Sequence, residues 1–368
     1  MIKIFFDKHP DFVVRLEHPF NAGPPPRLLN QSYITPTNLF FVRSHGDVPE
    51  VDVDSYRLEI NGQVSRPLNL SLGDLKDNFE HVNVSATLQC AGNRREELMA
   101  VESIPNELEW GVDAISHASW TGVRLRDVLA EAGVGSDTDS RLHVEFGGLD
   151  DVQRHNKIFH YGGSIPLSKG CSSEVILAYE MNDEPLTPVH GFPLRAIVPG
   201  YIGARSVKWL DRITVQDEPS QNYFQSRAYR LFAPHMRSET VDWEEGVMLG
   251  EMNVTSVICS HDENERIASG NVTVEGYAMA GGRRIARVDV SCDGGATWVQ
   301  AELTNEAGCW GWTLWKVNFD LKPGRCQLVV RAMDTSANTQ PQDVSQVWNF
   351  KGYMNNAWHR VNIEVVDD

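Results

Sequence analysis

The stretch TLQCAGNRREE, residues 87–97, places a cysteine at the end of an expected strand and directly before two arginines. Apolar and polar residues alternate over 82–88, which predicts a half-buried β-strand. A positive charge near a thiol favours the thiolate, so Arg94 and Arg95 make Cys90 a candidate reactive sulfur. A thiolate either attacks carbon or binds a soft metal. An inert buried thiol is the third alternative.

Local patterns around this stretch predict both strands and helices. In SLGDLKDNF, Ser71 is the expected N-cap of a helix and Asp74 stands at the capping-box position. Apolar side chains share one helical face over 125–132, and Gly133 is the expected stop of that helix. Asn61-Gly62, in YRLEINGQV, predicts a hairpin turn after a strand.

Beyond about residue 240 the pattern changes to short strands at regular spacing. Turn signals such as Asp293-Gly294-Gly295 and Pro323-Gly324 separate these strands, as in a sandwich of immunoglobulin type. A chain of 368 residues is long for one domain. We therefore predict an α+β chain, with a mixed α/β domain over 1–235 and an immunoglobulin-like β-sandwich over 236–368.

Charge and hydropathy exclude two classes of partner. The chain has 33 Lys and Arg against 50 Asp and Glu, a net charge of −17 that repels phosphate backbones, so we expect no nucleic acid. No run of eighteen apolar residues is present, and we expect no membrane span. The apolar run within 1–14 is short and interrupted by charge, unlike a secretory signal. We expect a cytoplasmic protein.

The six cysteines form no C-x-x-C pair, which argues against a structural zinc site. Without a secretory signal, the default expectation is reduced thiols. Cys292 and Cys326 stand in strand-like runs and are expected to fill core space.

Residues 190–210, HGFPLRAIVPGYIGARSVKWL, have the composition of a main-chain segment that binds an anion. Its glycines allow close approach of the main chain, and Arg195, Arg205 and Lys208 supply positive charge suited to a phosphate. The spacing matches neither a Walker loop nor a Rossmann fingerprint. A solvated basic loop is the alternative. FFVRSH, residues 40–45, and Tyr229 are weak signals when taken alone.

Several longer motifs, taken together, carry a resemblance to a known family. TLQCAGNRR, AYEMN followed by HGFPLR, VPGYIGARSVKWL, DGGATW, NTQP and NNAWHRV resemble the sulfite oxidase family, which includes the molybdenum core of assimilatory nitrate reductases. The resemblance extends from about residue 10 to the C-terminus. It implies a molybdenum–molybdopterin cofactor bound in the first domain, with the thiolate of Cys90 as a metal ligand.

The resemblance also implies the residues around that cofactor. The cofactor-binding positions are Phe41, Val42, Arg43, Ser44, His45, Cys90, Asp150, His190, Arg195, Ser206, Val207 and Lys208. The catalytic positions, which line an anion site beside the metal, are Cys90, Arg43, Arg95, Trp110, Tyr229 and Lys351. Lys351, in WNFKG, stands where sulfite oxidases carry arginine. Lysine keeps the charge but loses the planar fork, so we expect looser orientation of an oxyanion.

The activity implied by this resemblance is oxidation of sulfite to sulfate by oxygen-atom transfer, with Tyr229 donating a hydrogen bond and relaying a proton. The chain carries no haem-binding motif, so we expect no haem and an external electron acceptor: a cytochrome, another carrier or dioxygen. The second domain is implied to form a homodimer.

Other functions remain open at the level of sequence. Within the oxidoreductases, the same centre could reduce nitrate or act on another oxyanion or sulfur compound. From other classes come a thiol hydrolase that uses Cys90 and an immunoglobulin-like interaction protein without a cofactor.

Overall fold

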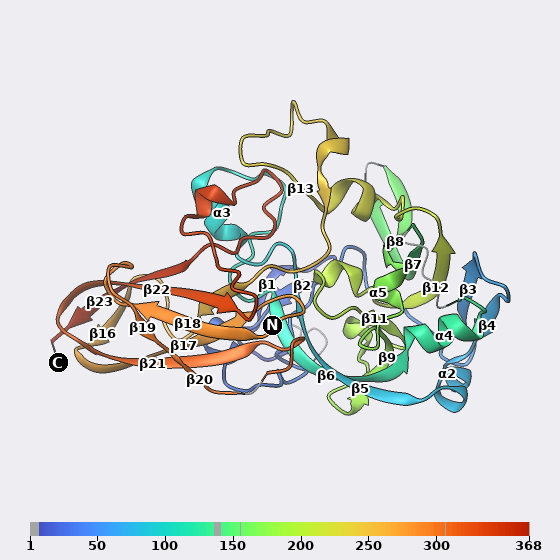
Figure 1. The fold of residues 1–368 in the computed structure, drawn as a ribbon, viewed down its shortest axis with the longest axis horizontal. Helices are drawn as coiled ribbons and strands as arrows, with labels where there is room; N and C mark the ends of the chain where they lie inside the picture. Colours follow the sequence, from blue (N-terminus) through green and yellow to red (C-terminus); the bar gives the residue numbers. More distant parts are fainter. Residues whose placement is uncertain (1–6, 136–140, 155, 306, 368) are drawn as a thin grey trace.

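The chain was examined in a computed structural model that describes residues 7–135, 141–154, 156–305 and 307–367. Two β-rich bodies lie side by side, one formed by the first part of the chain and the other by the last (Figure 1). Residues 1–6, the beginning of the apolar run at the N-terminal end, lie outside the described residues. Among the described residues, no helix is long and apolar enough to cross a membrane.

The first body is built on two five-stranded sheets. One has the order β10 (Glu184–Pro185), β9 (Ile176–Met181), β6 (Ile115–Arg124) and β5 (His81–Gln89), with β11 (Arg195–Ile197) also paired to β9. The other has the order β4 (Leu68–Leu70), β3 (Leu58–Gly62), β12 (Leu210–Gln216), β7 (His143–Arg154) and β8 (Lys157–Pro166). Two small pairs accompany them, β1 (Val13–Leu16) with β2 (Asn21–Gly23) and β13 (Arg230–Leu231) with β14 (Val247–Met248).

The helices of this body are short. They are α1 (Pro26–Leu29), α2 (Leu72–Asn78), α3 (Arg95–Val101), α4 (Leu125–Glu131) and α5 (Leu167–Gly170), and the longest of them span seven residues. Helix α4 buries Leu125, Val128 and Leu129 as its sequence predicts. Strands therefore dominate among the described residues, and the chain is more β-rich than the predicted α+β class implies.

The second body consists of two sheets around a core of their own. One has the order β15 (Thr255–Ile258), β17 (Gly270–Met279), β21 (Thr313–Leu321) and β20 (Glu302–Leu303), and the other β16 (Glu265–Ala268), β23 (His359–Val366), β22 (Gly324–Asp334), β18 (Ile285–Ser291) and β19 (Val299–Gln300). Val274 and Trp315 from the first sheet pack with Val288 and Val330 from the second. Alternate residues of each strand thus point inward between the sheets.

The predicted capping box is confirmed. The predicted hairpin is present between β3 and β4, which pair antiparallel with Ile60 opposite Leu68, but its connection is longer than the dipeptide Asn61-Gly62. The Ser71 hydroxyl accepts a hydrogen bond from the Asp74 amide, and the Asp74 carboxylate accepts one from the Ser71 amide. Asn61 and Gly62 lie inside β3, which pairs in parallel with β12. A Cβ at Gly62 would stand 2.2 Å from the Val215 carbonyl oxygen, so this glycine permits close strand approach and does not form a two-residue turn.

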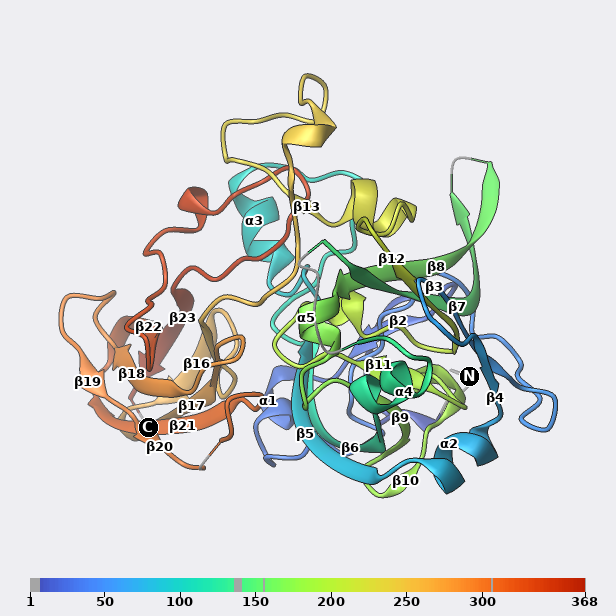
Figure 2. The same ribbon diagram turned by 45° about the vertical axis from the view of Figure 1, so that its right-hand side comes forward.

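Contacts between the two bodies hold the loop after β5. The Asn93 amide donates to the Tyr277 hydroxyl at 3.1 Å, and that hydroxyl donates to the Val112 carbonyl at 2.9 Å. The backbone amide of Met354 donates to the Ala91 carbonyl at 2.7 Å. The second body therefore fixes the segment that follows Cys90, and α3 and β13 lie above this junction (Figure 2).

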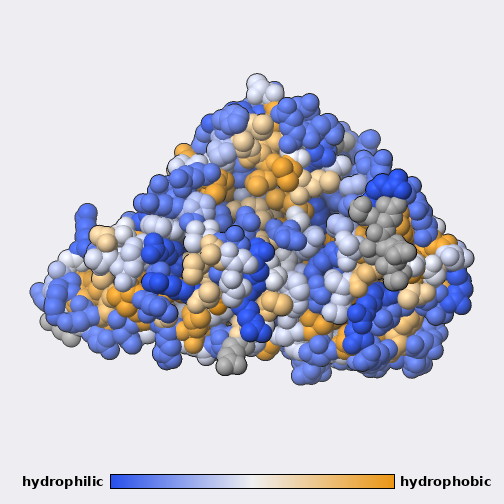
Figure 3. Space-filling view, viewed as in Figure 1, coloured by the Kyte–Doolittle hydropathy of each residue, from blue (hydrophilic) through white to orange (hydrophobic). Residues whose placement is uncertain are grey.

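Polar side chains cover most of the face drawn in Figure 3, with smaller apolar areas between them. This distribution agrees with the excess of acidic residues in the sequence.

Candidate active site

A pocket lies where the end of β5, the segment 40–45, strand β7 and the segment 190–209 meet. All twelve predicted cofactor-binding residues line it, together with Tyr229. The lining residues that the sequence did not single out are Phe40, Leu88, Tyr161, Ala204 and Trp209, whereas Gly203 is one of the glycines expected to let the main chain approach an anion.

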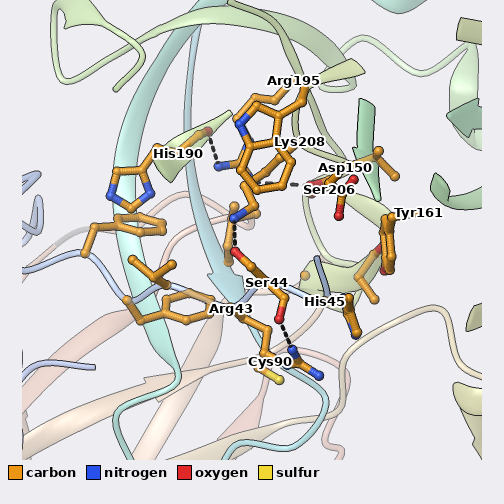
Figure 4. A pocket seen from close by; sticks show the side chains of 18 of the residues that line it. Arg43, Ser44, His45, Cys90, Asp150, Tyr161, His190, Arg195, Ser206 and Lys208 are labelled. Atoms are coloured by element: carbon orange, nitrogen blue, oxygen red, sulfur yellow. Dashed lines mark hydrogen bonds between the residues drawn. The ribbon is translucent and has the colours of Figure 1, made fainter. Parts of the chain in front are cut away.

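Cys90 stands at one end of this pocket. Figure 4 shows its sulfur near Arg43, with Arg195 and Lys208 toward the opposite end. The residue is 5% exposed, and the Gly92 amide donates to its Sγ at 3.4 Å. Strand β5 is half-buried at its start and fully buried from Ala86 onward, which carries the thiol into the interior. The sulfur thus faces a cavity and is not packed only among hydrocarbon.

Two of the cations expected near this thiol lie in different surroundings. Arg43 lines the pocket with Cys90, and its Nη1 donates to the Asn21 side chain at 3.1 Å. Arg94 instead forms a two-pronged ion pair with Glu97, at 2.6 and 2.7 Å. Its backbone has φ = 63°, a left-handed conformation at the start of α3. Arg94 is therefore a structural residue.

The opposite end of the pocket is strongly cationic. Lys208 Nζ donates to the Ser44 hydroxyl at 2.7 Å and to the Val189 carbonyl at 3.0 Å. Arg195 Nη1 donates to the His190 carbonyl at 2.9 Å. Burial lowers the pKa of Arg195 to about 9 and that of Lys208 well below its ordinary value. Buried cations are unfavourable unless anions or dipoles face them, so this end favours an anionic group.

Two polar atoms in the wall have no hydrogen-bond partner among the described residues: Asp150 Oδ1 and Arg195 Nε. Burial raises the pKa of the Asp150 carboxyl to about 6, and the Lys208 charge opposes this shift. Buried polar groups in native proteins are nearly always paired, which makes these two atoms candidate contacts for a polar ligand.

His190 is held by Lys8, a contact that no sequence pattern predicts. Lys8 Nζ contacts His190 Nε2 at 2.7 Å and also donates to the carbonyls of Thr37 and Phe40, at 2.8 and 2.9 Å. Burial lowers the pKa of His190 well below its usual range, so the ring is neutral and Nε2 accepts from the lysine. Lys8 lies in an irregular arm with no helical or strand periodicity that could reveal this contact.

Tyr229 and His45 form a second pair in the wall. The Tyr229 hydroxyl and His45 Nε2 are 2.9 Å apart, and the His45 ring stacks on Tyr161 with centroids 4.7 Å apart. Burial raises the pKa of Tyr229 to about 12 and lowers that of His45 well below its ordinary value. At neutral pH, therefore, a phenol donates to a neutral imidazole.

The other predicted catalytic residues lie behind the wall. Arg95 Nη1 donates to the Leu108 carbonyl at 2.7 Å, and Lys351 Nζ pairs with Glu107 at 2.6 Å. Trp110 is fully buried, and the Arg15 guanidinium lies 5.1 Å from its ring. Arg95, Trp110 and Lys351 are not among the described lining residues of the pocket.

The expected contribution of Arg205 to the cationic end is not found. Its Nη2 donates to the Leu249 carbonyl at 2.8 Å, and it does not belong to the described lining residues. The described residues also contain no group of three or more His, Cys, Asp and Glu placed to hold a metal. A metal beside Cys90 must therefore bring further ligands with it.

Comparisons with known proteins agree with this geometry. Residues 45–224 match the family model described as oxidoreductase molybdopterin binding domain, and residues 247–366 match the Mo-co oxidoreductase dimerisation domain. The chain is 45% identical over 368 residues to human mitochondrial sulfite oxidase, covering 97% of this chain and 66% of that protein. It therefore spans about two thirds of the length of this relative.

A plant relative is covered almost completely. The chain is 41% identical over 373 residues to sulfite oxidase of Arabidopsis thaliana, covering 96% of this chain and 94% of that protein. The fold is similar to that of the sulfane dehydrogenase SoxCD from Paracoccus pantotrophus, with a TM-score of 0.79, 27% identity, and coverage of 100% of this chain and 90% of that one. The chain thus belongs to the sulfite oxidase family of molybdopterin-dependent oxidoreductases.

Proposed function

We propose that this chain oxidises sulfite to sulfate by oxygen-atom transfer at a molybdenum ion bound to the Cys90 sulfur. The observation that carries the proposal is that this thiol and the cations Arg43, Arg195 and Lys208 line one cavity. A thiolate is a suitable ligand for a soft metal, and the cations suit the anionic groups of a cofactor and a substrate.

The residues present fit a molybdopterin. Arg195 and Lys208, at the end away from Cys90, would hold its phosphate. Asp150 Oδ1 and Arg195 Nε, which lack partners among the described residues, would pair with polar atoms of the pterin. Cys90 would complete the sulfur ligands of the metal. When bound, this cofactor supplies a metal that can change by two oxidation states and exchange an oxygen atom.

The protein's own part is to attract the anion and to hold a proton near it. One guanidinium about 4 Å from an anion contributes roughly 4 kcal/mol at an effective dielectric constant near 20. Arg43 is placed in the lining to act in this way, against a net charge of −17. The Tyr229 phenol keeps its proton at neutral pH, and its contact with His45 offers a path along which that proton can move.

Sulfite is favoured over other substrates by two residues. Tyr229 stands in the pocket wall, and Lys351 keeps a cation at the position where sulfite oxidases carry arginine. Nitrate or another sulfur compound is the second candidate. It is supported by 40% identity to the nitrate reductase [NAD(P)H] of Hordeum vulgare, over 97% of this chain and 42% of that protein, and by the similarity to a sulfane dehydrogenase.

The proposal extends to the assembly. We assign the catalytic domain to 1–235 and an immunoglobulin-like sandwich to 236–368, and infer a homodimer from the match to a dimerisation domain. Electrons pass to an external acceptor without a haem in this chain, and the protein acts in the cytoplasm. Sedimentation at micromolar concentration checks the dimer, and a monomer would refute this part.

Metal analysis and sulfite-dependent reduction of ferricyanide test the central claim on wild type and Cys90→Ser. Loss of a direct ligand should exceed the 10- to 100-fold effect typical of outer-sphere changes, so turnover is expected to fall by more than about 100-fold. Cys309→Ser, a half-buried thiol outside the pocket, is the matched control and should keep wild-type turnover. A Cys90→Ser enzyme with full molybdenum content and normal turnover contradicts the proposal.

A further inference from the structure

A half-buried carboxylate lies among the cations near the Cys90 end of the pocket. Glu107 Oε1 is 2.6 Å from Lys351 Nζ, and its Oε2 is 3.7 Å from Arg95 Nη2. The side chains of Glu107, Lys351 and Arg95 are 18%, 16% and 4% exposed. The resemblance to the family gave Arg95 and Lys351 as anion-site residues, and it gave no role to Glu107.

This ion-pair group stands next to the thiol. A Cβ at Gly92 would be 2.3 Å from Arg95 Nη2, so the guanidinium lies directly against the residue whose amide donates to Cys90 Sγ. The absence of a side chain at Gly92 is what makes room for it.

Aromatic contacts join the same group to the pocket wall. The Tyr353 ring lies 5.1 Å from the Arg95 guanidinium and 5.7 Å from Lys351 Nζ. The centroid of the same ring is 5.2 Å from that of Tyr229, which lines the pocket. The Tyr353 ring therefore contacts both the ion pairs and the wall of the proposed substrate site.

Glu107 is ionised in this setting. Burial opposes the charge, but the positive charges of Lys351 and Arg95 overcome it and lower the pKa of the carboxyl. Arg43, Arg95 and Lys351 together carry three positive charges, and Glu107 cancels one. An anion entering beside Cys90 is thus attracted by the cations and repelled by a carboxylate that is bonded to two of them.

We propose that Glu107 is a specificity-determining residue, which lowers the positive charge of the oxyanion site and so sets its preference between dianions and monoanions. This inference rests on the proposed function to the extent that small oxyanions bind beside Cys90. It adds that the affinity of the site for sulfite-like dianions is held below the value that its cations alone would give.

The physical argument predicts a definite ratio between two anions. The Coulomb energy between a removed unit charge and a ligand is proportional to the ligand charge. A dianion should therefore gain twice the binding free energy that a monoanion gains. Its dissociation constant should change by the square of the factor by which the monoanion's dissociation constant changes.

The test uses the holoenzyme of wild type, Glu107→Gln and Glu109→Gln, with sulfate as the dianion and nitrate as the monoanion. Calorimetric titration at fixed ionic strength gives both dissociation constants, and molybdenum content is checked for each variant. Glu107→Gln should bind sulfate about ten-fold and nitrate about three-fold more tightly. The KM for sulfite should fall together with the dissociation constant for sulfate. Glu109, an exposed residue two positions along the same loop, should leave both constants unchanged when substituted.

Lys351→Met is a second variant that keeps the inference testable if Glu107→Gln loads molybdenum poorly. This substitution lowers the charge of the site by one. The dissociation constant of sulfate should therefore rise by the square of the factor by which that of nitrate rises. Equal factors for the two anions, or unchanged or weaker sulfate binding by a loaded Glu107→Gln enzyme, would overturn the assignment. An enzyme that binds anions with the expected ratio but does not oxidise sulfite would refute the proposed function and leave the role of Glu107 standing.

Discussion

Individual side chains in the pocket carry charges that a folded interior does not normally hold. Arg195 and the partly buried Lys208 line the cavity, Lys8 is buried against His190 in its wall, and Asp150 is the carboxylate among the described lining residues. Removing such groups from water is unfavourable unless partners compensate. We interpret these charges as the means by which the cofactor-free protein is made to bind an anionic cofactor tightly.

Asp150 gives a pH-dependent prediction. Its pKa is raised from 3.8 to about 6, so its contribution to the free energy of unfolding is complete below about pH 4 and is lost as pH rises through 6. Relative to Asp150→Asn, cofactor-free wild type should lose roughly 3 kcal/mol between pH 4 and 7. Urea unfolding at several pH values measures this difference. A difference that does not change with pH would show that Asp150 is ionised without penalty.

Tyr229 gives a prediction for turnover. Because its pKa is about 12, the phenol stays protonated through the working range and can act as a donor. Positioned proton donors contribute factors of 10² to 10⁴, so Tyr229→Phe should lower kcat for sulfite about 100-fold. Steady-state rates from pH 6 to 10 check this. Unchanged turnover across that range would contradict the proton role.

Residues that line the pocket could be predicted from the sequence where they belong to a recognisable motif. All twelve expected cofactor residues line the pocket, because their motifs occupy strand ends and loops that the fold brings together. Lys8 and Glu107 could not be found in this way. Their importance comes from contacts across 182 and 244 residues of chain, and neither stands in a periodic or spaced pattern.

At the scale of elements, prediction succeeded where the signal is local. The capping box of α2 depends on Ser71 and Asp74 alone, and α4 follows from apolar spacing within two turns. The Asn61-Gly62 signal correctly predicted a hairpin, formed by β3 and β4, but not its longer connection, because the same glycine also lies against a neighbouring strand. That neighbour, β12, lies about 150 residues away in the chain, as the pairing of Asn61 with Thr214 shows.

The cap of α2 predicts a change in stability without a change in chemistry. Ser71→Ala removes the hydroxyl that accepts from the Asp74 amide and should lower the free energy of unfolding by about 1 kcal/mol. Ser71→Thr keeps an acceptor and should be close to wild type. Thermal unfolding together with sulfite turnover checks both variants. A loss of turnover in Ser71→Ala with stability unchanged would place α2 in the chemistry, contrary to expectation.

At the scale of the whole molecule, the two bodies share the active-site loop. Tyr277 belongs to the second body, yet its hydroxyl joins Asn93 and Val112 of the first. Such contacts could not be anticipated from sequence, since they depend on how two separately patterned domains pack together. The second body is therefore part of the scaffold of Cys90.

Tyr277→Phe tests this coupling. Losing a buried hydroxyl that bonds to two partners should lower the free energy of unfolding by about 1 to 3 kcal/mol and reduce molybdenum retention. Tyr179→Phe is the matched control, because that buried hydroxyl has no hydrogen-bond partner within the described part of the chain. Denaturant unfolding and metal analysis of both variants give the comparison. Equal effects of the two substitutions would argue against a scaffold role for Tyr277.

The hydrogen bond from Met354 to Ala91 also fixes an order of events during biosynthesis. A growing polypeptide on the ribosome exposes Cys90 long before residue 354 has been made. The loop that follows Cys90 cannot reach its final shape until residue 354 has been made, so insertion of the proposed cofactor must follow synthesis of the second body.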